Sequence, residues 1–324
     1  MNHNMFMNHN HIVLCTTPVE FTIEPSDLQK SRLTGENRQR WILIQVNTFT
    51  NWLNEQLSGT DLRIRDLSED LEDGTMLIHL VEVLQQRTCK GKIYRKNPSE
   101  IQMIMNVQMA LDALKEDGVK MVNIGAHDIV EGNAKLILGL IWCLIQRYQI
   151  NARTKIPAKK LMMAWLQNAL PQLKLTNFHS NWNDGRALSA LVEYCQPGLC
   201  PNWQQLGSEN ALKNCERAIG LAERYLNVPA IISPGDMSSA ELDELSCITY
   251  LSYFMKYNGP GYRATLERVR QMVPDMAVHD FEDTWKDGFL LCALVQAAGG
   301  KLDGTVDVTP STHAQRVSNI RKGK

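Results

Sequence analysis

One phrase occurs three times along this chain, and it limits the possible folds more than any other feature. Each copy has an apolar residue, one spacer, Asp-Gly, and then leucines at fixed offsets. The three pairs are Asp73-Gly74, Asp184-Gly185 and Asp287-Gly288. They stand roughly a hundred residues apart, so each lies in its own copy of a larger unit. The chain is therefore expected to contain three copies of one module.

Each phrase predicts the start of a helix that packs against a core. An aspartate at this position accepts hydrogen bonds from first-turn amides, and a glycine permits close approach of another backbone. In the first copy, Leu77, Leu80 and Val81 follow at offsets that share one face of a helix with 3.6 residues per turn. We expect that face to be buried in every copy.

An amphipathic helix precedes the phrase in each copy. In the first copy it covers residues 42–57, and its apolar stripe is Ile42, Val46, Phe49, Leu53 and Leu57. The residues left on its outward face are Asn47, Thr50, Asn51 and Asn54. This helix is expected to have one buried side and one polar side.

A further helix closes the first two copies. Residues 136–145 are apolar all round, which predicts a central helix buried on all sides, and residues 242–254 have the same role in the second copy. The third copy has no counterpart, so its other helices are expected to leave apolar faces uncovered and to fold marginally. The sequence thus predicts an all-α protein with two complete modules and a truncated third.

Changes in composition suggest where the parts begin and end. We expect a disordered polar tail over residues 1–40, a first module over 41–150 and a second over 161–258. Residues 151–160 form a basic linker, and residues 259–324 form the partial third copy.

Charge and motif content exclude several classes of function. The formal charge is −1, which lacks the basic footprint of a nucleic-acid-binding protein. The longest apolar run has ten residues, well short of the roughly 20 needed to cross a bilayer. The cysteines are scattered without metal-binding spacing, which is typical of reduced thiols in a cytosolic protein. Nucleotide, protease and hydrolase motifs are absent, so we expect no catalytic residues, metal or cofactor.

Two segments of the first copy resemble a known family. Residues 45–54 (Q-x-x-T-F-x-x-W-x-N) resemble the first actinin-type actin-binding signature, and residues 123–133 resemble the second. The first copy is therefore similar to a type 1 calponin-homology (CH) domain and the second copy to a type 2 domain. The second copy resembles the filamin group at residues 177–188, 197–203 and 228–229. A third CH copy is unusual in that group and resembles a three-CH filamin-like protein.

The resemblance implies an all-α tandem that binds F-actin, in the cytoplasm at the actin cytoskeleton and cell cortex. In the family the first CH domain makes the main contact and the second modulates it. A basic cluster in a Gly- and Pro-bounded loop of the first copy adds a local patch suited to an acidic surface. The candidate actin-binding residues are Asn47, Thr50, Asn51, Asn54, Lys90, Lys92, Arg95, Lys96, Lys120, Lys135, Arg147, Tyr148, Lys159 and Lys160. The candidate interdomain residues are Trp142, Glu244 and Leu245.

Several alternatives stay open at this point. The cluster Lys90–Lys96 has the composition of an ordinary solvated loop as well as that of a contact site. The basic linker either keeps the chain extended or binds a phosphoinositide headgroup. The whole module is alternatively a CH-based adaptor that binds microtubules or signalling proteins, or an enzyme whose catalytic residues are dispersed in the sequence.

Overall fold

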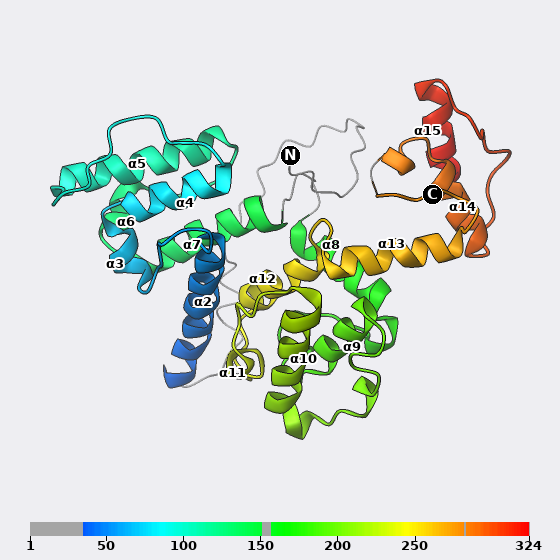
Figure 1. Ribbon diagram of the computed structural model, residues 1–324, viewed down its shortest axis with the longest axis horizontal. Helices are drawn as coiled ribbons and strands as arrows, with labels where there is room; N and C mark the ends of the chain where they lie inside the picture. The colour runs from blue at the N-terminus through cyan, green and yellow to red at the C-terminus, as the bar shows by residue number, and fades with distance from the viewer. Residues whose placement is uncertain (1–34, 151–156, 282, 324) are drawn as a thin grey trace.

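The computed structural model describes residues 35–150, 157–281 and 283–323 (Figure 1). Every regular element in these ranges is a helix, and they contain no strand, so the predicted all-α class is confirmed. No helix within the described ranges has the length and apolar character needed to cross a membrane. Residues 1–34 of the tail expected at 1–40, and most of the basic linker, lie outside the described residues.

The first module runs from α2 to the π-helix η1. Helix α2 begins at Gly35, six residues before the boundary expected at residue 41. The elements are α2 (Gly35–Gln56), α3 (Leu67–Glu72), α4 (Thr75–Gln85), α5 (Glu100–Glu116), α6 (Ala126–Val130), α7 (Ala134–Leu144) and η1 (Ile145–Ile150).

The second module runs from α8 to α12 and is joined directly to the third, which begins with α13. The second has α8 (Ala158–Ala169), η2 (Pro171–Leu173), α9 (Arg186–Cys195), η3 (Trp203–Gln205), η4 (Ser208–Asn210), α10 (Ala211–Leu226), α11 (Pro234–Met237) and α12 (Glu244–Met255). The third has α13 (Pro260–Met272), η5 (Asp283–Trp285), α14 (Phe289–Ala297) and α15 (His313–Lys322).

The repeated Asp-Gly phrase starts a helix in all three modules, as predicted. Asp73 Oδ1 accepts a hydrogen bond from the amide of Thr75 at 2.7 Å, and Asp184 and Asp287 each accept the equivalent bond at 2.9 Å. The glycines that follow have φ values of 74°, 75° and 73°, in the left-handed region that favours glycine. A Cβ there would lie within 2.7 Å of the backbone nitrogen of a facing helix, so the helices cross closely at this point.

A buried asparagine on that facing helix forms hydrogen bonds with the backbone beside the Asp-Gly pair, an arrangement that we call the asparagine clasp. Asn106 of α5 is 0% exposed, and its amide donates to the carbonyl oxygens of Asp73 and Tyr94 at 2.8 Å each. Its Oδ1 accepts from the amide of Tyr94 at 3.0 Å. The clasp therefore joins α4, α5 and the loop between them.

The same clasp recurs in the other two modules. Asn214 donates to the carbonyls of Asp184 and Gly207 at 2.9 and 3.0 Å. Asn319 donates to the carbonyls of Asp287 and Asp307 at 3.1 and 2.8 Å. Residues 260–323 thus reproduce the first half of the module in its hydrogen bonds as well as in its helix order.

Helix α2 is packed on two sides, and this changes its expected burial. It lies against α4 and α7 of the first module and also against α12 of the second. Consequently Thr48 and Trp52 are fully buried, whereas Ile42, predicted to be in the apolar stripe, is 38% exposed. That part of the prediction was wrong because the periodicity was read for a helix with one core-facing side.

The most deeply buried helix is α12 rather than α7. All residues from Ser246 to Met255 are buried, since α12 packs against α2, η1, α8 and α13 (Figure 1). Helix α7 was predicted to be buried on all sides, but Leu136, Trp142 and Cys143 are only half-buried. The apolar composition of α7 therefore overstates its burial.

The leucine face is fully covered in two modules and partly open in the third. Leu77, Leu80 and Val81 of α4 are at most 1% exposed, as are their counterparts in α9. In α14 the equivalent residues, Leu291 and Val295 among them, are half-buried. The third module has a small core of its own, made of Tyr262, Leu266, Val273, Val278 and Leu290. The expectation of marginal folding stays a prediction.

Candidate functional site

The polar residues on α2 divide into two groups. Asn47 Nδ2 donates to Asp236 of the second module at 3.2 Å, and Asn51 Nδ2 donates to the carbonyl of Ile231 at 3.0 Å. Asn54 instead brackets the backbone of Ile64 with two 2.8 Å hydrogen bonds inside the first module. Asn47 and Asn51 therefore belong to the contact between modules, whereas Asn54 holds the loop after α2. Thr50 is half-buried on the same helix.

Asp236 is the central charge of this contact. Its side chain is 6% exposed and pairs with Arg40 of α2 at 2.7 Å. The hydroxyl of Ser233 caps α11 by accepting from the Asp236 amide at 3.0 Å, which fixes the carboxylate in place. Burying a carboxylate is costly unless it is paired, so Arg40 and Asn47 are its necessary partners. We define the α2 interface as the contact that α2 makes with α11 and α12.

A second set of contacts lies at the C-terminal end of α2. Gln56 Nε2 donates to the hydroxyl of Tyr253 in α12 at 3.5 Å. Burial raises the pKa of Tyr253, and the carboxylate of Glu55 raises it further. Both ends of α2 therefore touch the second module, through mostly polar groups.

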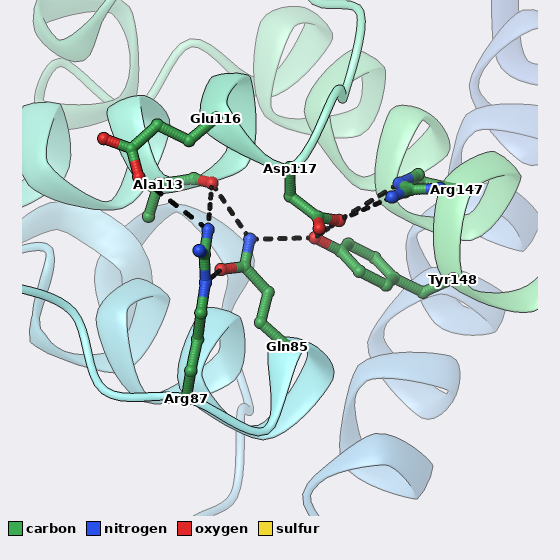
Figure 2. A network of polar contacts seen from close by, with 7 residues as sticks. All are labelled: Gln85, Arg87, Ala113, Glu116, Asp117, Arg147 and Tyr148. Atoms are coloured by element: carbon green, nitrogen blue, oxygen red, sulfur yellow. Dashed lines mark hydrogen bonds and ion pairs between the residues drawn. The ribbon is translucent and has the colours of Figure 1, made fainter. Parts of the chain in front are cut away.

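The end of the first module is held by a polar network (Figure 2). Asp117, at the C-cap of α5, accepts from the Tyr148 hydroxyl at 2.9 Å and from the Arg147 guanidinium at 3.1 Å. Gln85 Nε2 from α4 donates to the same hydroxyl at 2.9 Å and to the carbonyl of Ala113 at 3.1 Å. Burial raises the pKa of Tyr148 to about 12, and Asp117 contributes to the rise. The candidate residues Arg147 and Tyr148 are thus tied to the first module.

This network positions the π-helix η1, which continues α7 directly. A π-helix is rare and occurs mostly as a single turn within an α-helix. Here Arg147 and Tyr148 anchor one side to Asp117, and η1 packs against α12 of the second module. The end of the first module is therefore a second contact between the two modules.

The basic loop between α4 and α5 is exposed but has a defined shape. Lys90, Lys92, Arg95 and Lys96 are all exposed. The Asn106 clasp fixes the backbone of Tyr94, and the Lys92 ammonium lies 4.9 Å from the Tyr94 ring centre. Arg95 contacts the ring nitrogen of His79 at 2.9 Å. Four cations are thus presented on one anchored loop.

The other candidate residues are not brought to this loop. Lys120 and Lys135 are exposed at different places on the first module, and Lys160 is exposed in the first turn of α8. Lys159 forms an ion pair with Glu244, so Glu244 bonds within the second module. Trp142 stacks on Phe49 with ring centres 6.3 Å apart, and Leu245 packs against the main core.

Sequence reasoning missed the residues that organise the site. Asp236, Arg40 and Asp117 act through partners far away in the sequence, and no local pattern marks them. The clasp asparagines do have a signal: Asn106, Asn214 and Asn319 each follow the repeated Asp-Gly by a similar distance. A search for shared positions beyond the leucines would have found them.

The one strongly shifted carboxyl of the described residues has a structural explanation. Burial raises the pKa of Asp243 to about 6. Its Oδ2 caps α12 by accepting from the amide and hydroxyl of Ser246 at 2.7 and 2.8 Å. Within the described ranges, no three His, Cys, Asp or Glu side chains are grouped so as to hold a metal ion. Asp243 is therefore accounted for as a helix cap.

Comparison with known proteins gives consistent results. The model of the calponin homology (CH) domain family matches residues 43–150 and 156–259. The chain is 43% identical to Filamin-C of Rattus norvegicus over 250 residues, which are 74% of this chain and 9% of that protein. It is 40% identical to Filamin-A of Drosophila melanogaster over 241 residues, 70% of this chain and 11% of that protein. The chain thus spans about a tenth of the length of these relatives.

Two further similarities extend the comparison. The erythrocytic spectrin beta chain of Mus musculus is 38% identical over 244 residues, 71% of this chain and 11% of that protein. A solved structure, the actin-crosslinking core of Schizosaccharomyces pombe fimbrin, superposes with a TM-score of 0.54 at 21% identity. It covers 85% of this chain and 66% of the other, and at this identity the likeness concerns the fold alone.

Proposed function

This chain belongs to the calponin homology family, with a tandem of the filamin type, and we propose that it is the actin-filament-binding module of a filamin-like cytoskeletal protein. The observation that carries the proposal is the tandem itself: this chain contains two adjacent CH copies, and 70–74% of the chain matches filamins from two animals. The activity is binding, with no catalytic step and no cofactor. The module works in the cytoplasm, at the actin cytoskeleton and cell cortex.

The first CH domain, residues 41–150, makes the main filament contact in this proposal. Its exposed cations Lys90, Lys92, Arg95 and Lys96 favour an acidic protein surface, and Lys120 and Lys135 add charge elsewhere on the domain. Exposed charges attract a partner over a Debye length of only about 8 Å at 0.15 M ionic strength. Binding should therefore weaken as salt is raised.

The second CH domain, residues 161–258, modulates that contact by packing against α2. Asn47 and Asn51 are exposed, but their side-chain amides are bonded to the second domain in the closed arrangement, so a filament must break these hydrogen bonds to bind those amides. Moving such an equilibrium from 1:99 to 99:1 requires about 5.5 kcal/mol of differential binding. A change that weakens the α2 interface should therefore raise the affinity for filaments.

The remaining parts have proposed roles of lesser weight. Residues 259–324 form a partial third CH domain. The basic linker 151–160 joins the first two domains and is the segment with the charge to bind a phosphoinositide headgroup. Lys159 and Lys160, at its end, are exposed and suited to either an acidic protein surface or such a headgroup.

High-speed cosedimentation of the full chain with actin filaments tests the proposal. At 50 mM salt the chain should pellet with filaments, and at 200 mM the bound fraction should fall. A charge-removed variant, Lys90→Ala with Lys96→Ala, should bind less and show a shallower salt dependence. A chain that remains in the supernatant with filaments but pellets with microtubules would replace the proposal with the adaptor alternative.

A further inference from the structure

Helix α13 is joined to the second module by a turn that has little room to move. The Gly259 amide donates to the carbonyl of Lys256 at 2.8 Å. A Cβ on Gly259 would lie 2.8 Å from the carbonyl oxygens of Tyr253, Phe254 and Lys256. The connection from α12 to α13 is thus a tight turn packed against the end of α12.

One face of α13 packs against Trp165 and Tyr194 of the second module, and we call this contact the α13 seat. Gly261, Thr265 and Arg268 follow at helical spacing and lie over α9 and over Trp165 of α8. A Cβ on Gly261 would be 2.4 Å from the Trp165 ring, so only glycine allows α13 to approach so closely. The Arg268 guanidinium lies 4.1 Å from the centre of the Tyr194 ring.

The Thr265 hydroxyl is the polar centre of this seat. It accepts from the Trp165 indole at 3.1 Å, because an indole N–H can only donate, and it donates to the carbonyl of Gly261 at 2.7 Å. It lies 2.9 Å from the Tyr194 hydroxyl, whose proton fits its remaining lone pair. The one donor and both acceptor positions of the Thr265 hydroxyl are thus in use, and Thr265 is half-buried.

Aromatic and thiol groups complete the seat. The rings of Trp165 and Tyr194 meet edge to face with centres 6.4 Å apart. Burial raises the pKa of the Cys195 thiol to about 12, while Arg263 and Arg268 of α13 act in the opposite direction. Without α13, this surface would present a tryptophan, a tyrosine and a cysteine to solvent.

A neighbouring face of α13 begins the core of the third module. Tyr262, Leu266, Val269 and Val273 also follow at helical spacing and pack in that core. The Tyr262 ring meets Phe281 with centres 5.1 Å apart, and it also meets Tyr257, from the end of the second module, at 5.3 Å. Figure 1 shows α13 extending from α12 to the third module. The same helix is therefore a working part of two modules.

We infer that α13 locks the third module onto the second, so that the two move as one rigid body and the Trp165–Tyr194 face is withheld from outside partners. When the α2 interface opens, the third module is carried along with the second. Part of α8, the helix that opens the second module, is covered as well, because Trp165 lies in it. This inference concerns packing inside the chain and does not depend on the partner of the first module.

Residual dipolar couplings measured by NMR on the full chain test the inference. If the two modules form one body, couplings from residues 157–258 and 260–323 should fit a single alignment tensor of one magnitude. Gly261→Ala should displace α13, so that the couplings of the third module shrink relative to those of the second. The matched control is Gly220→Ala in α10, where an added Cβ meets nothing within 4 Å, and it should leave one tensor.

A second measurement covers a variant that perturbs the seat without changing its shape. Thr265→Val removes the acceptor of Trp165 and should speed hydrogen exchange of the α13 amides about tenfold, with α4 and α5 unchanged. Two tensors of different magnitude in the unaltered chain would overturn the inference. So would a single tensor that persists in Gly261→Ala together with unchanged exchange in Thr265→Val.

Discussion

Asp236 holds the α2 interface closed, and its removal should increase filament affinity. Asp236→Ala removes the 2.7 Å ion pair with Arg40 and the 3.2 Å hydrogen bond from Asn47. Both are hydrogen bonds to a charged group, which contribute about 1.5–3 kcal/mol each when well buried. The Arg40 side chain is 43% exposed and Asn47 is also exposed, so both regain water when Asp236 is lost, and the net loss is about 1–2 kcal/mol.

That loss converts directly into affinity. A change of about 1–2 kcal/mol alters the ratio of open to closed forms about 5- to 30-fold. The apparent dissociation constant is the intrinsic one divided by the binding-competent fraction, so it should fall by the same factor while the closed form dominates. High-speed cosedimentation over a range of filament concentrations measures it. The matched control is Glu216→Ala, which removes the same charge from an exposed site on α10 and should bind like the unaltered chain.

Removing Arg40, the other partner of the ion pair, distinguishes opening of the α2 interface from local damage around Asp236. Arg40→Ala should also lower the dissociation constant, and combining it with Asp236→Ala should add less than the sum of the two single effects, because they share one interaction. If both single variants bind filaments with unchanged affinity, the α2 interface does not control access and this reasoning is wrong.

Four further predictions concern stability and charge. Asp243→Asn keeps the cap but removes a buried carboxyl whose pKa is raised to about 6. As the pH rises from about 4 to about 6 this carboxyl ionises in a buried site, so the free energy of unfolding of the unaltered chain should fall relative to that of the variant, by up to about 3 kcal/mol. Urea unfolding at a series of pH values measures it. Asn106→Ala should destabilise the first module by about 2–4 kcal/mol by thermal unfolding, because it leaves buried carbonyls unpaired. Asn319→Ala should abolish hydrogen-exchange protection in α14 and α15 while α4 and α9 stay protected, because the third core is small. Lys90→Ala with Lys96→Ala should weaken filament binding several-fold at low salt and little at high salt.

Each of these has a result that would refute it. A pH profile shared by the unaltered chain and Asp243→Asn would mean that the buried carboxyl does not titrate as stated. Unchanged thermal stability of Asn106→Ala, or retained protection in Asn319→Ala, would show that the clasps are dispensable. Equal weakening by the paired lysine change at both salt concentrations would contradict a screened electrostatic contact.

The fold was largely predictable from the sequence because its signal is periodic. The Asp-Gly pairs and the leucines of α4 and α9 mark helix starts and buried faces by spacing alone. The prediction for α2 was less accurate at Ile42, since periodicity identifies an apolar stripe but not a second packing partner. Asn47 and Asn51 look like solvated polar residues in the sequence, and only the tertiary arrangement shows them bonded to another module.

The contacts between modules could not be predicted for the same physical reason. Arg40 and Asp236 are 196 positions apart, and a charge pair leaves no periodic trace. Helix α13 combines two faces, Gly261 with Thr265 on one and Tyr262 with Leu266 on the other, so its pattern is that of an ordinary amphipathic helix. Which neighbour covers each face is decided by the tight turn at Gly259 and the shape of Trp165.

Electron cryomicroscopy of actin filaments decorated with the full chain tests the central claim most directly. The account predicts density for the first module against the filament, with α2 and the segment ending near Tyr148 at the contact. The second and third modules should lie together on the side away from the filament. Filaments contacted through the second or third module alone, or filaments that stay bare even with Asp236→Ala, would contradict it.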